Sequence, residues 1–167
     1  MAESKLYTCC SKIICNGCDY ANSLRELEQG LDHKCPFCRE PDAKTREEAD
    51  QNSMKRIKAN DPVAICGFGK QRFHEGNYEE AFKYYSKAAE LGFADAHYEV
   101  AGAYLEGRGV EKDTKKAFYH LEEAAIGGHH HARFNLGVLA HNARRSDRAV
   151  KHFIIGASLG DDKSLDN

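Results

Sequence analysis

Cysteine is concentrated at the start of the chain. The sequence has 167 residues and seven cysteines, six of which lie within the first 38 positions. They form one adjacent pair and two pairs separated by two residues: Cys9, Cys10, Cys15, Cys18, Cys35 and Cys38. Two thiolates at the latter spacing reach one tetrahedral zinc ion, with zinc–sulfur distances of about 2.3 Å. The cluster therefore predicts a zinc-binding segment.

Disulfide bonds are the alternative use of paired cysteines, and they need an oxidising compartment. The first ten residues, MAESKLYTCC, lack the apolar core of a signal peptide. No apolar run approaches the roughly 18 residues needed to cross a bilayer. We therefore expect a soluble cytoplasmic or nuclear protein with no membrane contact, in which the cysteines bind metal.

The order of the cysteines resembles that of an all-cysteine RING finger. The motif is C-C-S-K-I-I-C-N-G-C, followed after a spacer of 16 residues by C-P-F-C-R. A complete RING binds two zinc ions crosswise, the first ligand pair with the third and the second with the fourth. The three cysteine pairs here match the second, third and fourth pairs in that order. No counterpart of the first pair precedes Cys9, so the resemblance covers part of the family domain.

The resemblance implies one complete zinc site, made by the second and fourth pairs: Cys9, Cys10, Cys35 and Cys38. Cys15 and Cys18 are left with half a ligand set. His33 could complete a rearranged site with them, although its place next to the last pair is also that of an exposed loop histidine. Because a segment of about 40 residues hardly folds on a core alone, the metal should stabilise it. Several nearby apolar residues should pack around it: Leu6, Ile13, Ile14, Leu24, Leu27, Leu31 and Phe37.

The rest of the chain repeats itself three times. EEAFKYYSKAAELG at 79–92, KKAFYHLEEAAIGG at 115–128 and DRAVKHFIIGASLG at 147–160 share apolar offsets of three and four and a final glycine. This spacing is typical of an amphipathic helix that ends at a glycine. A second apolar face precedes each, beginning at Ala64, Ala96 and Ala132. Each unit is therefore predicted to be helix, turn and helix.

Such units cannot bury their apolar faces alone and must stack on their neighbours. We therefore predict an all-α fold, a right-handed helical-repeat solenoid. Small residues at equivalent positions (Ala81, Ala117 and Ala149) should let helices approach closely. Phe82, Tyr85 and Phe118 should fill the core between them. Asp113 should cap the helix that follows the GRGV turn.

The middle unit reads A-x-Y-x-V-A-x-x-Y-x-x-G-x-G-V-x-x-D and resembles the Sel-one-like repeat, a relative of the tetratricopeptide repeat. The first and third units lack the glycine-rich turn. The predicted organisation is a partial RING finger at 1–44, a connecting helix at 45–58, and three repeats at 59–160 (about 59–94, 95–129 and 130–160). Residues 161–167 would begin a fourth repeat. We expect that a partner covers the last helix or that the natural protein is longer.

The connecting helix should begin at a capping box made by Thr45 and Glu48, and it should pack on the first repeat. The next helix should be capped by Asn60 or Asp61, with Pro62 in its first turn. His129, His130 and His131 point in different directions on a helix and are not expected to share a metal. Cys66 takes an aromatic position of the first repeat and should be a buried structural thiol.

Two functions fit these features. A formal net charge of −2 without a basic cluster argues against nucleic acid, so protein partners are expected on the repeat surface. The RING resemblance implies a ubiquitin-ligase-like protein with no catalytic side chain of its own, in which Pro36 and Arg39 contact a ubiquitin-conjugating enzyme. The alternative is a non-enzymatic adaptor in which zinc is purely structural. A C-x2-C motif upstream of Met1 would favour the ligase.

Overall fold

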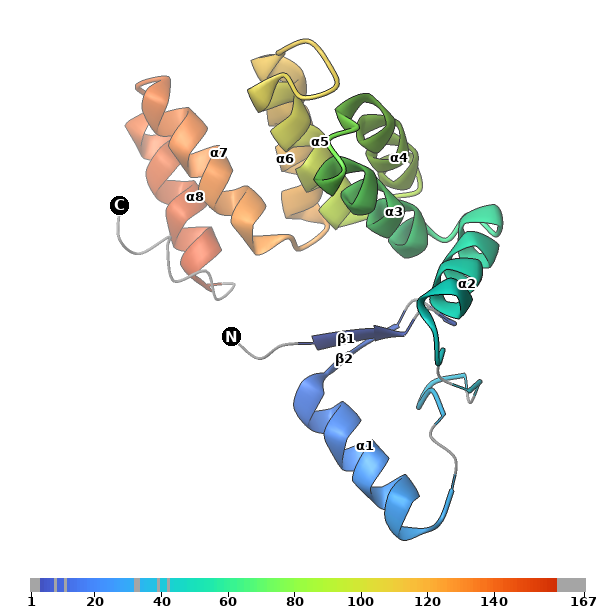
Figure 1. Cartoon of the computed structure of the whole chain (residues 1–167). Helices are drawn as coiled ribbons and strands as arrows, with labels where there is room; N and C mark the ends of the chain where they lie inside the picture. Colours follow the sequence, from blue (N-terminus) through green and yellow to red (C-terminus); the bar gives the residue numbers. More distant parts are fainter. Residues whose placement is uncertain are drawn as a thin grey trace. The chain divides into compact units, whose positions relative to one another are not determined.

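The computed structural model describes residues 4–7, 9–10, 12–31, 34–38, 40–41 and 43–158. The chain forms two compact units, Met1–Ala64 and Ile65–Asn167. Figure 1 labels the elements of both units along the chain. His33, Arg39 and the predicted fourth repeat at 161–167 lie outside the described residues.

Two short antiparallel strands open the N-terminal unit (Figure 1). β1 (Ser4–Tyr7) pairs with β2 (Lys12–Cys15), with Tyr7 opposite Lys12. β2 leads directly into α1 (Asn16–Glu28). This hairpin is not among the elements that the sequence predicts, because strands of four residues are too short for an alternating apolar pattern to be evident.

Polar side chains hold this hairpin and the following loop to α1. Tyr7 has no exposed surface, and its hydroxyl donates a hydrogen bond to the carboxylate of Asp19 in α1. Glu26 is also buried, and its carboxylate accepts a hydrogen bond of 3.4 Å from the backbone N–H of Lys34. By contrast, Leu27 is 76% exposed and Leu31 is 53% exposed. Apolar packing in the described part of this unit is therefore thin.

α2 (Arg46–Lys58) begins after the predicted cap Thr45, but the Glu48 carboxylate accepts from the Lys44 N–H and not from the Thr45 N–H that a capping box uses. The Thr45 hydroxyl accepts a hydrogen bond of 3.2 Å from the backbone N–H of Glu48. The Glu48 carboxylate in turn accepts one of 2.8 Å from the backbone N–H of Lys44. No residue of α2 is buried. Its predicted packing on the first repeat stays a prediction.

Six helices follow, each of 13 residues, in the part of the chain that the structure describes (Figure 1): α3 (Pro62–His74), α4 (Tyr78–Glu90), α5 (Ala94–Glu106), α6 (Thr114–Ile126), α7 (His130–Asn142) and α8 (Ser146–Ser158). They form successive helix–turn–helix pairs that stack side by side. The backbone N–H groups at the start of α3 donate to the Asp61 carboxylate, which caps the helix as predicted. None of the described helices combines the length and the apolarity needed to span a membrane.

Alanines let these helices pack closely. An alanine occupies the same position near the start of the second helix of each repeat. These alanines are almost fully buried: Ala81 is 1% exposed, Ala117 0% and Ala149 2%. Larger buried side chains fill the space between them: Ile65, Tyr85, Val100, Leu121 and Leu136. The repeat register predicted for the alanines and for Tyr85 is therefore confirmed. Phe118 is only half-buried, so one side of this ring is left accessible.

The turn between α5 and α6 needs its second glycine. Gly109 has φ of 72°, and a Cβ there would lie 2.1 Å from the backbone carbonyl oxygen of Tyr78 at the start of α4. The turn therefore packs against the preceding repeat. Asp113 then caps α6 as predicted, accepting hydrogen bonds of 3.0 Å from the N–H groups of Lys115 and Lys116.

Candidate metal centre

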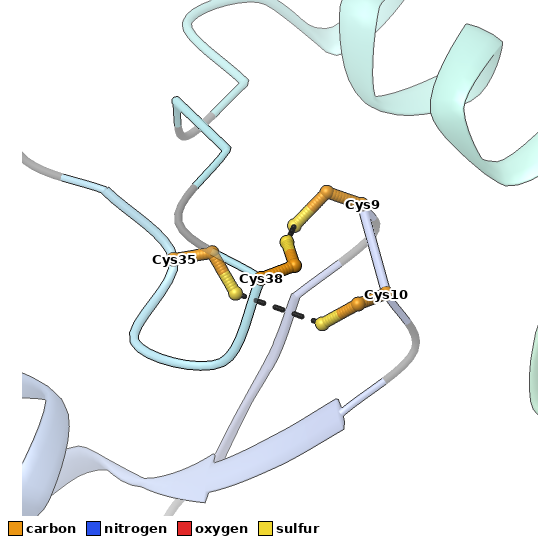
Figure 2. Close-up of side chains that lie close together, drawn as sticks. All are labelled: Cys9, Cys10, Cys35 and Cys38. Carbon is orange, nitrogen blue, oxygen red and sulfur yellow. Dashed lines mark hydrogen bonds between the residues drawn. The ribbon is translucent and has the colours of Figure 1, made fainter.

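Four cysteine sulfurs meet between the hairpin turn and the loop that follows α1. Cys9 and Cys10 come from the turn between β1 and β2, and Cys35 and Cys38 from the loop (Figure 2). The sulfurs pair crosswise, Cys38 Sγ lying 3.4 Å from Cys9 Sγ and Cys10 Sγ lying 3.6 Å from Cys35 Sγ. All four lie within 4.8 Å of one another, close enough to hold one metal ion.

These distances fit a tetrahedral ion. Four sulfurs at about 2.3 Å from a central zinc are separated by about 3.8 Å along each edge of the tetrahedron. The measured pairs, at 3.4 and 3.6 Å, are close to this edge and far longer than a disulfide bond. A set of four thiolates also suits zinc better than the oxygen-preferring Mg²⁺ or Ca²⁺. The residues present therefore fit a structural zinc ion.

The thiols differ in their ease of ionisation. Burial raises the pKa of Cys9, and so do hydrogen bonds with the Cys38 and Cys35 side chains. Burial likewise raises the pKa of Cys10. For Cys35 burial acts in the same direction but is outweighed, because the backbone N–H groups of Cys38 and Phe37 donate to its sulfur and lower its pKa. Such donors stabilise a thiolate, as the outer partners of metal ligands do.

The other residues predicted from the sequence lie outside the four-sulfur cluster or outside the described residues. Cys18 lies exposed near the start of α1 and is not one of the four clustered sulfurs. Cys15 ends β2, and its side chain is outside what the structure describes. Pro36 lies half-buried in the turn between the two loop cysteines. His33 and Arg39 are among the residues that are not described.

Two aromatic side chains lie beside the candidate metal centre. Tyr7, directly before the Cys9 turn, contacts the ring of Phe37 edge to face at a centroid distance of 6.3 Å. Phe37 lies between the two loop cysteines, so the contact links the two halves of the ligand set. Phe37 is among the apolar residues expected near the metal, whereas Tyr7 is missed. The feature of the sequence that could have indicated the role of Tyr7 is an aromatic residue close to a cysteine pair.

The repeat histidines form no cluster of three or more ligands in the described residues. His129 instead stacks on Tyr98, with ring centroids 4.2 Å apart. Its pKa is lowered by burial, although Asp95 acts in the opposite direction. Cys66 is 2% exposed, as expected of a structural thiol, and burial raises its pKa to about 12.

The architecture of the second unit is that of a helical-repeat solenoid, a class of proteins built from stacked helix pairs. The Sel1 repeat model matches residues 65–93, 94–129 and 130–161, which together make up more than half of the chain. The chain therefore belongs to the Sel1 repeat family. Among solved structures it resembles a Sel1 repeat protein from Oxalobacter formigenes, with a TM-score of 0.68 and 26% identity over 87% of this chain and 58% of that one.

A second solved structure, the cysteine-rich protein B of Helicobacter pylori, shares the fold with a TM-score of 0.57 and 23% identity, over 71% of this chain and 91% of that one. Among curated proteins, the chain is 35% identical to the DAP3-binding cell death enhancer 1 of Rattus norvegicus, over 74% of this chain and 32% of that protein. It is 29% identical to an exopolysaccharide production negative regulator of Rhizobium leguminosarum, over 64% of this chain and 40% of that protein. The chain thus spans less than half of each of these two curated relatives.

Proposed function

We propose that this chain is a non-catalytic interaction scaffold, in which Sel1 repeats bind a protein partner and one zinc ion organises the N-terminal unit. The observation that carries the proposal is the convergence of four cysteine sulfurs from two separate segments. Without a metal ion, no strongly favourable interaction accounts for four thiols at this spacing. Zinc bound by Cys9, Cys10, Cys35 and Cys38 supplies one.

The partner-binding role is supported by the family. Sel1 repeat proteins generally bind protein partners, and the name of the rat relative describes binding to another protein. Stacked helix pairs present an extended surface without needing a catalytic centre. The zinc segment then adds a second surface to the scaffold.

Native mass spectrometry of the purified chain tests the zinc proposal. About one tightly bound zinc ion is expected, because four thiolates complete one tetrahedral site. Cys10→Ser and Cys38→Ser should each lose the ion, whereas Cys18→Ser, a matched change at an exposed cysteine outside the cluster, should retain it. A second, equally tight ion would show that further groups complete another site. A chain without zinc would refute the proposal.

A RING-type ubiquitin ligase is the second candidate, favoured by one observation. The cysteines that converge are those that the RING resemblance pairs crosswise, the second pair with the fourth. Figure 2 shows this crossing from the hairpin turn to the loop. In that interpretation Pro36 and Arg39 contact a ubiquitin-conjugating enzyme, and the repeats bind the substrate.

Ubiquitin discharge tests this second candidate. With a complete first ligand pair supplied upstream, the protein should accelerate discharge of ubiquitin from a conjugating enzyme. Arg39→Ala should sharply slow discharge while leaving zinc content and helicity unchanged, since the guanidinium bridges two surfaces that lysine would not bridge well. If no conjugating enzyme of a broad panel is accelerated, the N-terminal unit acts as an adaptor surface only.

A further inference from the structure

A groove crosses the C-terminal end of the repeat array, between the second helices of the middle and last repeats. It has a volume of about 740 Å³ and lies between α6, the end of α7 and α8. Its floor is apolar and is made by Phe118, Leu139, Ala140 and Ile155. Phe118 and Leu139 pack against the buried cluster that contains Leu121 and Leu136. The floor is therefore held in place by the core of two repeats.

The rim of the groove is strongly basic. Four cationic side chains line it, from α6 (Lys115), the α7–α8 turn (Arg145) and α8 (Arg148 and Lys151). Glu122 is the one acidic residue among the lining side chains. Lys116, the neighbour of Lys115 outside the groove, is paired with Asp113. For the four rim cations, the described residues provide no such ion pair.

A histidine also lines the groove. His152 lines it from α8 and is half-buried. Its pKa is lowered by burial and by the positive charges of Arg133 and Arg148, against the opposing effect of Glu122. The positive charges of Arg133 and Arg148 thus disfavour a further positive charge at this point of the groove, in addition to the effect of burial.

We propose that this groove binds an acidic amphipathic segment of a protein partner, with apolar side chains on the Phe118 and Leu139 floor and carboxylates against Lys115, Arg145, Arg148 and Lys151. The inference names one surface for the partner binding proposed above and rests on that role. An open recess of this volume is within the range of about 300 to 1,000 Å³ typical of ligand sites. In helix-in-groove recognition, an amphipathic helix lays its apolar face into an apolar groove of this kind.

Two other anionic ligands fit less well. Nucleic acid would contact the cations through phosphates and would leave the apolar floor without a counterpart. A membrane surface needs apolar side chains that project outward into the lipid, whereas Phe118 and Leu139 in the floor are half-buried against the repeat core. An acidic protein segment satisfies both the floor and the rim.

Fluorescence anisotropy with the full chain and a labelled synthetic peptide tests the proposal. The peptide is a helix of about 14 residues with leucines on one face and glutamates on the others, long enough for roughly four turns. We expect saturable binding with a Kd below about 1 mM. Arg148→Glu combined with Lys151→Glu should weaken binding about tenfold or more, and added salt should weaken it further. Lys87→Glu, a charge reversal on α4 outside the groove, should leave binding unchanged.

A reporter in the groove locates the binding site. The chain contains no tryptophan, so Ala143→Trp, at an exposed position of the groove, supplies a single emission signal that should shift to the blue when the peptide binds. Circular dichroism confirms that each variant is folded. Absence of binding, binding that the double reversal leaves unchanged, or binding without a tryptophan shift overturns the proposal. In the last two cases the chain still binds a protein segment outside the groove, so the proposed scaffold function stands while the groove assignment fails.

Duplex DNA and vesicles of phosphatidylserine and phosphatidylcholine are the competing probes. Neither should bind through the groove. If either binds more tightly than the acidic peptide and loses binding in the double reversal, the acidic protein segment is the wrong ligand class and the proposal is overturned.

Discussion

At the residue scale, a pair of imidazoles sits between α5 and α6. His97 Nδ1 and His120 Nδ1 lie 3.0 Å apart, so one ring must donate and the other must accept. The His120 ring also lies against Tyr104, with centroids 5.9 Å apart. Its pKa is lowered by burial and by His97, although Glu123 acts in the opposite direction. The contact therefore requires that at least one ring be neutral.

This pair predicts that the repeats lose stability in mild acid. Because the pKa of His120 in the folded chain is below its ordinary value of 6.5, the unfolded chain binds more protons as pH falls through that value. The free energy of unfolding should therefore decrease between about pH 7 and pH 5, as measured by urea denaturation. His120→Gln should reduce the decrease. Part of it should remain, since burial also lowers the pKa of His129 and His152. An unaltered pH dependence in His120→Gln would contradict this account.

At the element scale, the sequence predicts the helices far better than it predicts the hairpin. Apolar offsets of three and four recur in each repeat, and the cap at Asp113 can be recognised from residue type, whereas residue type leaves Asn60 and Asp61 as equal candidates for the cap of α3. The hairpin has no comparable signal, since its turn is formed by cysteines rather than by glycine or asparagine. The convergence of its cysteines with Cys35 and Cys38 follows from the RING resemblance and not from local periodicity. The groove floor could not be predicted from the sequence either. Apolar periodicity places Phe118 on a buried face of the helix, but it does not determine how much of the ring neighbouring helices cover.

The packing of α7 against α8 can be tested at one glycine. A Cβ at Gly137 would lie 2.5 Å from Cε1 of Phe153, a ring that is 8% exposed, whereas a Cβ at Gly102 in α5 would meet nothing within 4 Å. Gly137→Val should lower the free energy of unfolding by about 1 to 3 kcal/mol through overpacking. Gly102→Val, the same substitution in an open position, should be neutral or slightly stabilising, because valine is a better helix former than glycine. Chemical denaturation followed by circular dichroism compares the two. Equal effects would mean that α7 and α8 do not pack as described.

A second test at this scale uses the alanine that the repeats share. Ala117 has no exposed surface, so Ala117→Arg would bury a charge and overfill the site. The cost, several kcal/mol, is a large part of a typical stability of about 5 to 15 kcal/mol. We expect the repeats to unfold. Tyr119→Arg, two residues along α6 at a position 54% exposed, should melt like the unchanged protein, and an intact melting curve for Ala117→Arg would refute the burial.

At the scale of the whole molecule, the two units differ in what stabilises them. The repeats bury alanines and large apolar side chains along every helix, and each repeat supports its neighbour. In the N-terminal unit the described buried side chains are few, Tyr7, Cys35 and Glu26, and one of these, Cys35, belongs to the proposed zinc site. A domain this small generally needs a metal, a disulfide or a partner in order to fold.

Removal of zinc should therefore unfold one unit and leave the other intact. Zinc binding to small cysteine sites is worth roughly 10 to 16 kcal/mol at neutral pH, which is more than the thin apolar packing around Tyr7 can replace. When the full chain is treated with EDTA, limited proteolysis should cleave within the first 44 residues, while the cooperative melting transition of the repeats persists at nearly the same temperature. Without any chelator, Cys38→Ser should be cleaved in the same region as the EDTA-treated chain. Cys18→Ser should resist the protease as the unchanged chain does. If the repeat transition disappears together with the metal, folding of the repeats depends on the zinc segment. If neither treatment exposes the N-terminal unit to protease, zinc is not what holds it folded.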